Sequence, residues 1–171
     1  YYHPSERFGA TGGINFKMYE DWRYFTNIDT GYFQVSYVKA YIPSIFMECF
    51  YLPAENSRFV GNITFTAPTS DDGKILPYYS PVQISVYYRH LWIKNFGTTA
   101  GLDYTGERYT DLANTSKIGG FVNVYIAADY KLFKDISVSC RLDNLTNSDI
   151  YIWNGYKERG IYFELGISWQ F

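Results

Sequence analysis

Five ionisable residues towards the carboxy terminus have types and spacings that suit a polar surface on a sheet. They are Asp129, Lys131, Arg141, Asp143 and Glu164. The first two lie two positions apart, as do the next two, and residues two apart on a β-strand point to the same face. Charges grouped in this way can contact a charged or hydrogen-bonding solute that passes over the surface. They can also neutralise one another across neighbouring strands, which is the interpretation that we favour.

No arrangement of side chains predicts catalysis or metal binding. His3 and His90 lie far apart in segments of different character, so neither a histidine-based triad nor a metal centre is expected. The sequence contains no Gly-x-Ser-x-Gly turn of the serine-hydrolase type. Residues 71–73, Asp-Asp-Gly, can help to bind a cation, but we favour a solvated loop tip. The sequence therefore predicts a protein that is not an enzyme, with no catalytic or metal-binding residues and no cofactor.

Charge, cysteine content and hydropathy argue against several further classes of protein. The formal net charge of -2 and the lack of a basic stripe argue against a nucleic-acid partner. Cys49 and Cys140 allow at most one disulfide, and we expect two unpaired thiols. There is no run of about 18 apolar residues, so no transmembrane helix is predicted. The sequence opens at Tyr1 with no signal peptide, as expected of a mature form or of a piece of a longer protein.

The final stretch, residues 160–171, indicates the kind of element that must position these charges. Its odd positions are apolar, and its even positions are small or polar. Side chains of a β-strand alternate between faces, so the stretch predicts a strand with one apolar and one polar face. The apolar positions are Ile161, Phe163, Leu165, Ile167, Trp169 and Phe171.

The same alternation recurs along the chain and predicts an all-β protein of about nine or ten strands. Crossing a bilayer takes about 9–11 residues, and the part of residues 23–41 before Asp29 is shorter than that. We therefore expect residues 23–41 to form one long strand with its far end beyond the membrane, and Pro43 to mark a break. Splitting this segment at Asp29 would raise the count from nine to ten. The predicted strands are residues 9–19, 23–41, 45–51, 58–66, 82–88, 98–110, 122–132, 136–142 and 160–171.

The aromatic content favours a membrane barrel over a soluble sandwich. Tyr, Phe and Trp make up 21% of the residues, more than a soluble core of this size needs, and barrels place such rings at both membrane–water interfaces. Short connections at 94–97 and 133–135 alternate with long ones at 67–80, 111–120 and 147–158. Outer-membrane barrels have this alternation, with the short turns on the periplasmic side. The predicted fold is an antiparallel transmembrane β-barrel of outer-membrane type, with residues 1–171 as one barrel segment and the five charges facing its lumen.

The last strand resembles the closing strand of Gram-negative outer-membrane β-barrels, in which alternating apolar residues lead to a terminal phenylalanine. Trp169 and Phe171 stand at the corresponding positions of the apolar face. The resemblance implies that barrel-insertion machinery reads this strand. We therefore expect Trp169 and Phe171 to form the assembly signal.

Three further stretches are similar to the carboxy-terminal strands of TonB-dependent outer-membrane receptors. Residues 76–81, Leu-Pro-Tyr-Tyr-Ser-Pro, resemble the proline-flanked entry to a late strand of that family. Residues 106–111, with Asn114 and Thr115, resemble the loop after the following strand. Residues 143–147, Asp-Asn-Leu-Thr-Asn, resemble the final hairpin, together with Tyr151, Gly155, Tyr156, Arg159, Gly160 and Phe171.

This resemblance implies energised uptake of a scarce ligand, such as an iron chelate, a vitamin or a sugar, with a plug domain as the gate. It implies a place in the bacterial outer membrane with the carboxy terminus in the periplasm. The expected partners are outer-membrane lipid, the insertion machinery, a TonB-type energy coupler if a plug lies upstream, and other membrane proteins. The alternative is a small, non-transporting structural barrel that anchors an outer-membrane assembly.

The strand count bears on this choice. Family barrels have about 22 strands and a plug, whereas the present residues hold no plug domain and have room for nine or ten strands. Single-chain bacterial barrels have even strand numbers, and an unpaired edge in hydrocarbon leaves backbone groups without partners. We therefore predict that this chain supplies one wall of a larger barrel.

Overall fold

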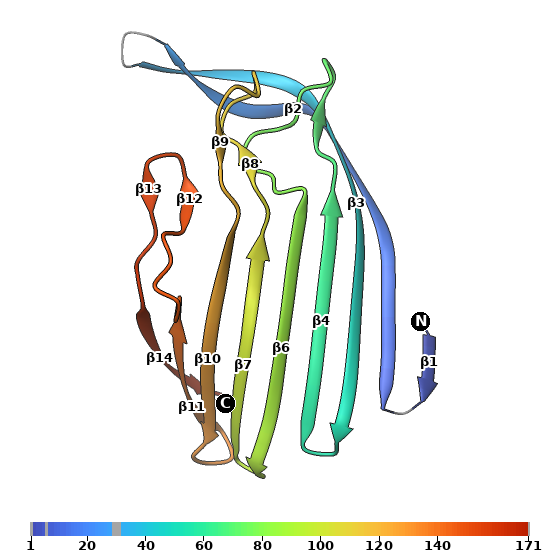
Figure 1. The fold of residues 1–171 in the computed structure, drawn as a ribbon, viewed down its shortest axis with the longest axis vertical. Helices are drawn as coiled ribbons and strands as arrows, with labels where there is room; N and C mark the ends of the chain where they lie inside the picture. The colour runs from blue at the N-terminus through green and yellow to red at the C-terminus, as the bar shows by residue number, and fades with distance from the viewer. Residues whose placement is uncertain (1, 6, 29–31, 171) are drawn as a thin grey trace.

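Nine strands follow one another through a single antiparallel sheet in the computed structural model of this protein (Figure 1). The structure describes residues 2–5, 7–28 and 32–170. A tenth strand, β5 (Thr69–Ser70), branches from β3. The nine on the main path are, in order, β1 (Tyr2–Ser5), β2 (Phe8–Ile28), β3 (Tyr32–Ala54), β4 (Ser57–Thr66), β6 (Val82–Ile93), β7 (Phe96–Thr105), β10 (Phe121–Lys131), β11 (Ile136–Asp143) and β14 (Tyr162–Trp169).

Connections at the two ends of the sheet differ in length. At the short-turn end, residues 55–56, 94–95 and 132–135 link successive strands. At the long-loop end, residues 67–81, 106–120 and 144–161 do so. Two of the long loops contain small hairpins, β8 (Arg108–Tyr109) with β9 (Lys117–Ile118), and β12 (Tyr151–Trp153) with β13 (Tyr156–Lys157). None of the residues that the structure describes belongs to a helix long and apolar enough to cross a membrane.

Two strands near the amino terminus are much longer than the others. β2 has 21 residues and β3 has 23, and they pair with each other as far as Ile28 and Tyr32. The prediction that residues 23–41 form one long strand was therefore wrong. The two halves of that segment pair with each other in a hairpin that extends beyond the rest of the sheet (Figure 1). Each half is only part of a longer strand, because β2 already begins at Phe8 and β3 continues to Ala54. Neither half therefore has to cross a bilayer by itself. The proposed dividing point, residues 29–31, lies outside the described residues.

The predicted break at Pro43 is also wrong. β3 continues through Pro43, which lies opposite Phe16 of β2. The Pro43 carbonyl accepts a hydrogen bond from the Ala67 amide at 3.0 Å. The N–H and C=O of one residue point to the same neighbour in an antiparallel pair, so the donor that proline lacks would point towards Ala67, just beyond the end of β4 at Thr66, and not towards β2. The ladder between β2 and β3 therefore loses no hydrogen bond at Pro43.

The register gives the sheet two faces of opposite character, because directly paired residues share a face. On the apolar face, Ile126, Leu142 and Phe163 are successive partners on β10, β11 and β14. On the polar face, one row of partners crosses six strands and contains only polar side chains. That row is Asn123, Asp103, Ser85, Asn62, Glu48 and Thr11.

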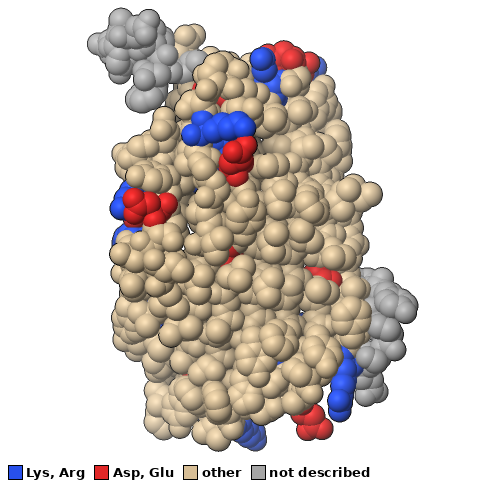
Figure 2. Space-filling model, viewed as in Figure 1, with Lys and Arg blue, Asp and Glu red and all other residues tan. Residues whose placement is uncertain are grey.

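The apolar face stays uncovered by any other part of the described chain. Ile14 is 80% exposed, Ile167 74% and Leu165 66%. The view in Figure 2 shows Lys, Arg, Asp and Glu mostly near the two ends of the molecule, with a broad and almost uncharged middle. Outer-membrane barrels present such an apolar band to lipid. A contiguous apolar surface of this kind marks a contact with a membrane or a partner.

The buried core is small and lies at the long-loop end. Ala40, Ile42 and Leu76 form its centre, with Trp22 packed against it. Ala40 and Ile42 belong to β3, Trp22 to β2, and Leu76 to the loop of residues 67–81, whose strand β5 also pairs with β3. The core therefore fastens the long hairpin to this loop.

The sheet is open at both edges. Among the residues that the structure describes, β14 pairs on one side only, with β11, and β1 pairs only with the start of β2. Within the ranges that the structure describes, no strand joins β14 to β1 or β2. The predicted all-β antiparallel fold, with about nine strands that do not close a barrel by themselves, is confirmed.

We expect Ile126→Arg to lower the free energy of unfolding by about 2–4 kcal/mol, because this side chain lies near the middle of the apolar band, where an arginine would face hydrocarbon. Ser139→Arg, on the polar face of the neighbouring strand, should cost much less. Denaturant titration of the complete polypeptide in lipid vesicles measures both values. Similar costs on the two faces would contradict the membrane orientation of the sheet.

Candidate functional site

Arg141 and Asp143 form the most buried ion pair of the polar face. Arg141 Nε and Nη2 donate to the two carboxylate oxygens of Asp143 at 2.6 and 2.8 Å. The Asn123 side-chain amide donates to the same carboxylate at 2.9 Å. Only 2% of Asp143 is exposed. A buried carboxylate without partners is strongly unfavourable, so this end of β11 depends on the pair.

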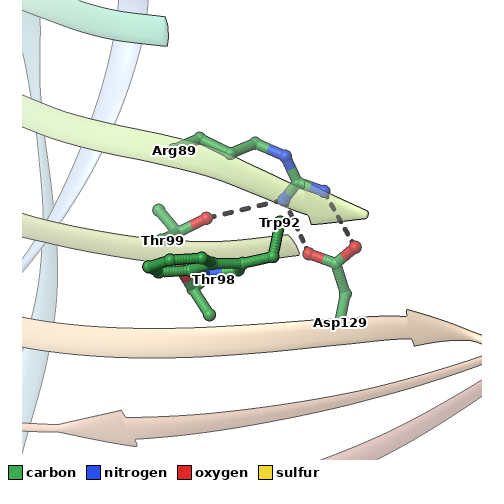
Figure 3. A network of polar contacts seen from close by, with 5 residues as sticks. All are labelled: Arg89, Trp92, Thr98, Thr99 and Asp129. Atoms are coloured by element: carbon green, nitrogen blue, oxygen red, sulfur yellow. Dashed lines mark hydrogen bonds and ion pairs between the residues drawn. The ribbon is translucent and has the colours of Figure 1, made fainter. Parts of the chain in front are cut away.

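Asp129 pairs with Arg89 of β6, two strands away, and not with Lys131 (Figure 3). Arg89 Nη1 and Nη2 donate to the two carboxylate oxygens at 2.7 and 2.8 Å. Gly97, on the strand between them, lies directly opposite Asp129. A Cβ atom at Gly97 would stand 2.8 Å from Arg89 Nη2. The glycine therefore gives the guanidinium room to cross β7.

Lys131 and Glu164 share the polar face with the other three charges. Among the described residues, neither of the two forms a salt bridge. Glu164 stands opposite Arg141 in the ladder, but Arg141 turns to Asp143 instead. The five sequence-predicted charges thus lie on one face, and three of them belong to two ion pairs. That this face lines a lumen remains a prediction.

Tyr125 belongs to the same network and was not predicted as a site residue. The Arg141 guanidinium carbon lies 3.7 Å from the centre of the Tyr125 ring, in cation–π contact. Tyr125 is buried, and its ring lies over Gly101 of β7, where a Cβ atom would come within 2.6 Å of it. Both Arg89 and Tyr125 therefore lie across glycines of β7. Glycine at polar-face positions of a strand was the one sequence signal that could have indicated these contacts.

Asn144 holds the turn that follows β11. Its φ of 51° is in the left-handed region that asparagine tolerates better than most residues. The backbone N–H of Asn144 donates to Asn123 Oδ1 at 2.8 Å. The side-chain amide of Asn144 donates to the Ser148 and Arg159 carbonyls at 2.9 and 3.2 Å. Asn144 is 1% exposed. One residue thus ties both ends of the loop of residues 144–161 to the sheet.

Arg108 joins two of the long loops and was missed at the sequence level. Its Nη2 donates to the Tyr151 and Ile152 carbonyls at 2.6 and 3.2 Å, and its guanidinium lies 5.5 Å from the centre of the Phe121 ring. Burial lowers the pKa of this guanidinium, while Tyr78 acts in the opposite direction. A loop arginine carries no periodic signal, so its burial follows only from the way in which the loops converge.

A cavity of about 760 Å³ opens where these loops converge. Its walls include Tyr24 and Phe25 of the long hairpin, Tyr78 of the loop of residues 67–81, Asp111 of the next loop, and Asn154. The structure brings together aromatic rings, charged groups and hydrogen-bonding groups from four parts of the sequence. In the described residues, no group of three or more His, Cys, Asp or Glu is arranged to hold a metal ion.

Asp111 organises one wall of this cavity. Its carboxylate accepts hydrogen bonds from the Thr115 and Ser116 amides at 3.0 and 2.8 Å and from the Thr115 hydroxyl at 3.2 Å. Partial burial alone would raise the pKa of Asp111, but these hydrogen bonds to its charged form hold the pKa below its ordinary value. The carboxylate therefore stays charged at neutral pH.

The predicted assembly signal is only partly within the described residues. Trp169 lies on the apolar face and is 70% exposed, whereas Phe171 lies outside the described residues. Their role in assembly stays a prediction. Cys49 and Cys140 are both free thiols on the apolar face, as expected.

Comparison with solved structures relates this sheet to outer-membrane receptors. The copper transporter OprC superposes with a TM-score of 0.77 at 14% identity, over 99% of this chain and 30% of that one. The siderophore receptor PirA from Acinetobacter baumannii gives 0.69 at 15%, over 98% and 30%. The ferric-catecholate import receptor Fiu from K12 E. coli gives 0.64 at 17%, over 98% and 26%. No family model matches the sequence, and no curated protein matches it.

At these identities the likeness establishes the fold. The chain folds as a portion of the β-barrel of TonB-dependent outer-membrane receptors. It spans 30% or less of the length of these receptor chains. The resemblance inferred from the sequence is confirmed at the level of the fold.

Gly97→Val should destabilise the protein by about 1–3 kcal/mol, because the added side chain must displace Arg89 and open its ion pair with Asp129. Gly119→Val is the matched control, since a Cβ atom at Gly119 meets no atom within 4 Å. Denaturant titration in vesicles measures both variants. A Gly97 variant as stable as the Gly119 variant would show that the crossing arginine contributes nothing.

Asn144→Ala should increase amide exchange in residues 144–161 by about tenfold or more, because it removes side-chain hydrogen bonds and strains a left-handed residue. Asn144→Gly separates the two causes, since glycine relieves the strain but does not restore the hydrogen bonds. Hydrogen–deuterium exchange resolved by peptide measures the effect. Unchanged exchange in both variants would contradict the anchoring role of Asn144.

Proposed function

We propose that this chain forms one wall of a transport barrel of TonB-receptor type in the bacterial outer membrane. The observation that carries the proposal is an open sheet with a bare apolar face, a charged polar face and convergent loops at one end. A membrane barrel requires the first two features. The chains that share the fold include a copper transporter and a ferric-catecholate import receptor, which supports a role in transport.

The open edges support a wall rather than a closed barrel. Among the described residues, β14 and the part of β2 beyond its pairing with β1 have no strand beside them on one side. An unpaired edge in hydrocarbon costs several kcal/mol for each backbone group. Further strands of the same polypeptide would pair with both edges, and a plug domain outside this segment would fill the lumen. The small, closed structural barrel is the weaker alternative, since it requires β14 to pair with the start of the chain.

The proposed orientation places the short-turn end in the periplasm. Gln170, directly after β14, donates its backbone N–H to the Asp135 carbonyl at 2.9 Å, so the end of β14 lies beside the turn of residues 132–135. Short turns of outer-membrane barrels are periplasmic. Barrel-insertion machinery and a TonB-type energy coupler would then act from that side, and the cavity would open to the outside.

The proposed ligand is a scarce solute such as an iron chelate, a vitamin or a sugar, held first in the cavity at the long-loop end. Tyr24, Phe25 and Tyr78 offer ring faces there, and Asp111 and Lys74 offer charge. Such a mixture suits a ligand with both flat and hydrogen-bonding groups. The charged polar face would then meet the ligand or the plug inside the barrel.

Uptake by cells that produce the complete receptor tests this proposal. Radiolabelled iron chelates, vitamins and sugars are offered to cells with and without a working energy coupler. We expect uptake of one class that depends on both the receptor and the coupler. Coupler-independent entry of all classes, or no entry of any, would overturn the proposal.

Phe25→Ala should weaken binding of that ligand by about tenfold, the usual scale for loss of one aromatic contact. Phe25 is 73% exposed, so the change should leave the fold intact. Phe133→Ala is the matched control, because Phe133 is 68% exposed at the opposite end of the sheet. Equal affinities of the two variants for the ligand would show that the cavity is not part of the binding site.

A further inference from the structure

The polar face of the sheet has two hollows, one towards each edge. The first, called here the β14 hollow, has a volume of about 510 Å³. Its polar-face residues are Ala127, Ser139, Arg141, Glu164 and Gly166. The second, the β3 hollow, has a volume of about 410 Å³. Its polar-face residues are Thr11, Phe46, Glu48, Asn62 and Thr64.

Glycines of the polar face contribute to both hollows. A Cβ atom at Gly166 would stand 2.7 Å from Ser139 Oγ, so bare backbone forms part of the floor of the β14 hollow. Beside the β3 hollow, a Cβ atom at Gly13 would stand 2.8 Å from the Phe46 ring. The Phe46 ring therefore lies against the backbone of β2 at Gly13.

Each hollow contains one exposed carboxylate, Glu164 in the β14 hollow and Glu48 in the β3 hollow. Neither carboxylate has an ion pair among the described residues. The ladder partner of Glu164 is Arg141, which binds Asp143 instead. The partner of Glu48 on β4 is Asn62, which has no charge. Both carboxylates are thus available to a positive group from outside the described chain.

The other charges of the polar face are neutralised in place or lie outside the two hollows. Arg89 and Arg141 each have their own aspartate. The polar-face charges that line neither hollow, and that have no ion pair among the described residues, are Lys17, Arg58, Asp103 and Lys131. Asp103 accepts a hydrogen bond from the Ser85 hydroxyl at 2.6 Å. Glu48 and Glu164 therefore differ from these charges in having an open space beside them.

The two hollows are too far apart for one small solute to contact both. The strands between β3 and β14 are β4, β6, β7, β10 and β11. Neighbouring strands lie about 4.8 Å apart, which places Glu48 and Glu164 about 29 Å apart along the sheet. A domain of about 100 residues has a radius of gyration of about 13 Å and can span such a distance. A single body that occupies both hollows must therefore have the size of a protein domain.

We infer that a domain of the same polypeptide docks on the polar face by placing an arginine or lysine side chain in each hollow. The inference rests on the proposed function, which puts a plug domain inside the barrel. A domain that fills the lumen removes water from the wall, and a carboxylate without water is unfavourable unless a positive group pairs with it. An arginine is the better fit, because its planar guanidinium can bind both carboxylate oxygens.

Photocrosslinking from positions beside the hollows tests the inference. Cells produce the complete receptor with p-benzoylphenylalanine in place of Ser168 on β14 or Thr66 on β4. Both residues belong to the polar face. We expect both positions to crosslink to one domain outside residues 1–171, at peptides that contain an arginine or lysine. Ile167 and Phe65 are the matched control positions, since they lie one residue away on the apolar face and should crosslink to lipid.

Reversal of charge tests the chemistry of the contact. Glu164→Lys should reduce the crosslinks from position 168 by about tenfold or more, the scale expected when a desolvated charge pair is replaced by two like charges. Glu164→Gln keeps the shape of the side chain and should reduce them less. Asp103→Lys is the matched control, because it makes the same change of charge on the same face outside the hollows. It should leave the crosslinks unchanged.

Uptake measured in the same cells separates this inference from the proposed function. Polar-face crosslinks to solute alone or to a second receptor molecule, in cells that still take up the ligand, would overturn the docking only. Crosslinks to a domain that Glu164→Lys leaves unchanged would overturn the contact with a basic side chain. Lipid crosslinks from both faces of the sheet would overturn the membrane orientation, and the proposed function with it.

Discussion

A single antiparallel sheet with no second layer is the constraint on which the rest of this structure depends. Its backbone groups pair from β2 to β14, but its apolar side chains have nothing in the described chain to pack against. Water is an unfavourable neighbour for so much contiguous apolar surface. Lipid would cover the apolar face, and further strands would pair with the two edges, since only a closed barrel leaves no unpaired backbone in hydrocarbon. The proposed membrane location and the proposed larger barrel are thus two consequences of one architecture.

On the polar face, glycines leave room for side chains of non-adjacent strands to come into contact. β7 has glycine at two positions of its polar face, Gly97 and Gly101. Arg89 and Tyr125 lie against the bare backbone at these two positions. Arg89 reaches Asp129 across the first, and Tyr125 lies flat over the second and meets Arg141. Ion pairs on a water-filled surface contribute modestly to stability. Here the glycines allow the charges of β6, β10 and β11 to lie close to the sheet while they form their ion pairs.

At the long-loop end, a few buried side chains hold the loops in place, whereas the sheet is held by backbone hydrogen bonds between strands. Leu76 fixes one loop to the long hairpin, Arg108 joins the second loop to the third, and Asn144 ties the third to the sheet. Each of these residues is at most 6% exposed. The cavity between the loops is therefore built by contacts among segments far apart in the chain. A receptor can vary such loops while keeping the sheet, because the two are held by different interactions.

The sequence by itself determined the all-β class, the alternation of residues 160–171 and the single face shared by Asp129, Lys131, Arg141, Asp143 and Glu164. It also placed the limits of β4, β10, β11 and β14 to within two residues. These features follow from the two-residue repeat of a strand, which is a local property of the chain. Only the tertiary structure decided that Asp129 pairs with Arg89, that residues 23–41 belong to one hairpin, and that β3 continues through Pro43. Each of these depends on which residues of other strands stand alongside, and register between strands is not encoded by alternation alone.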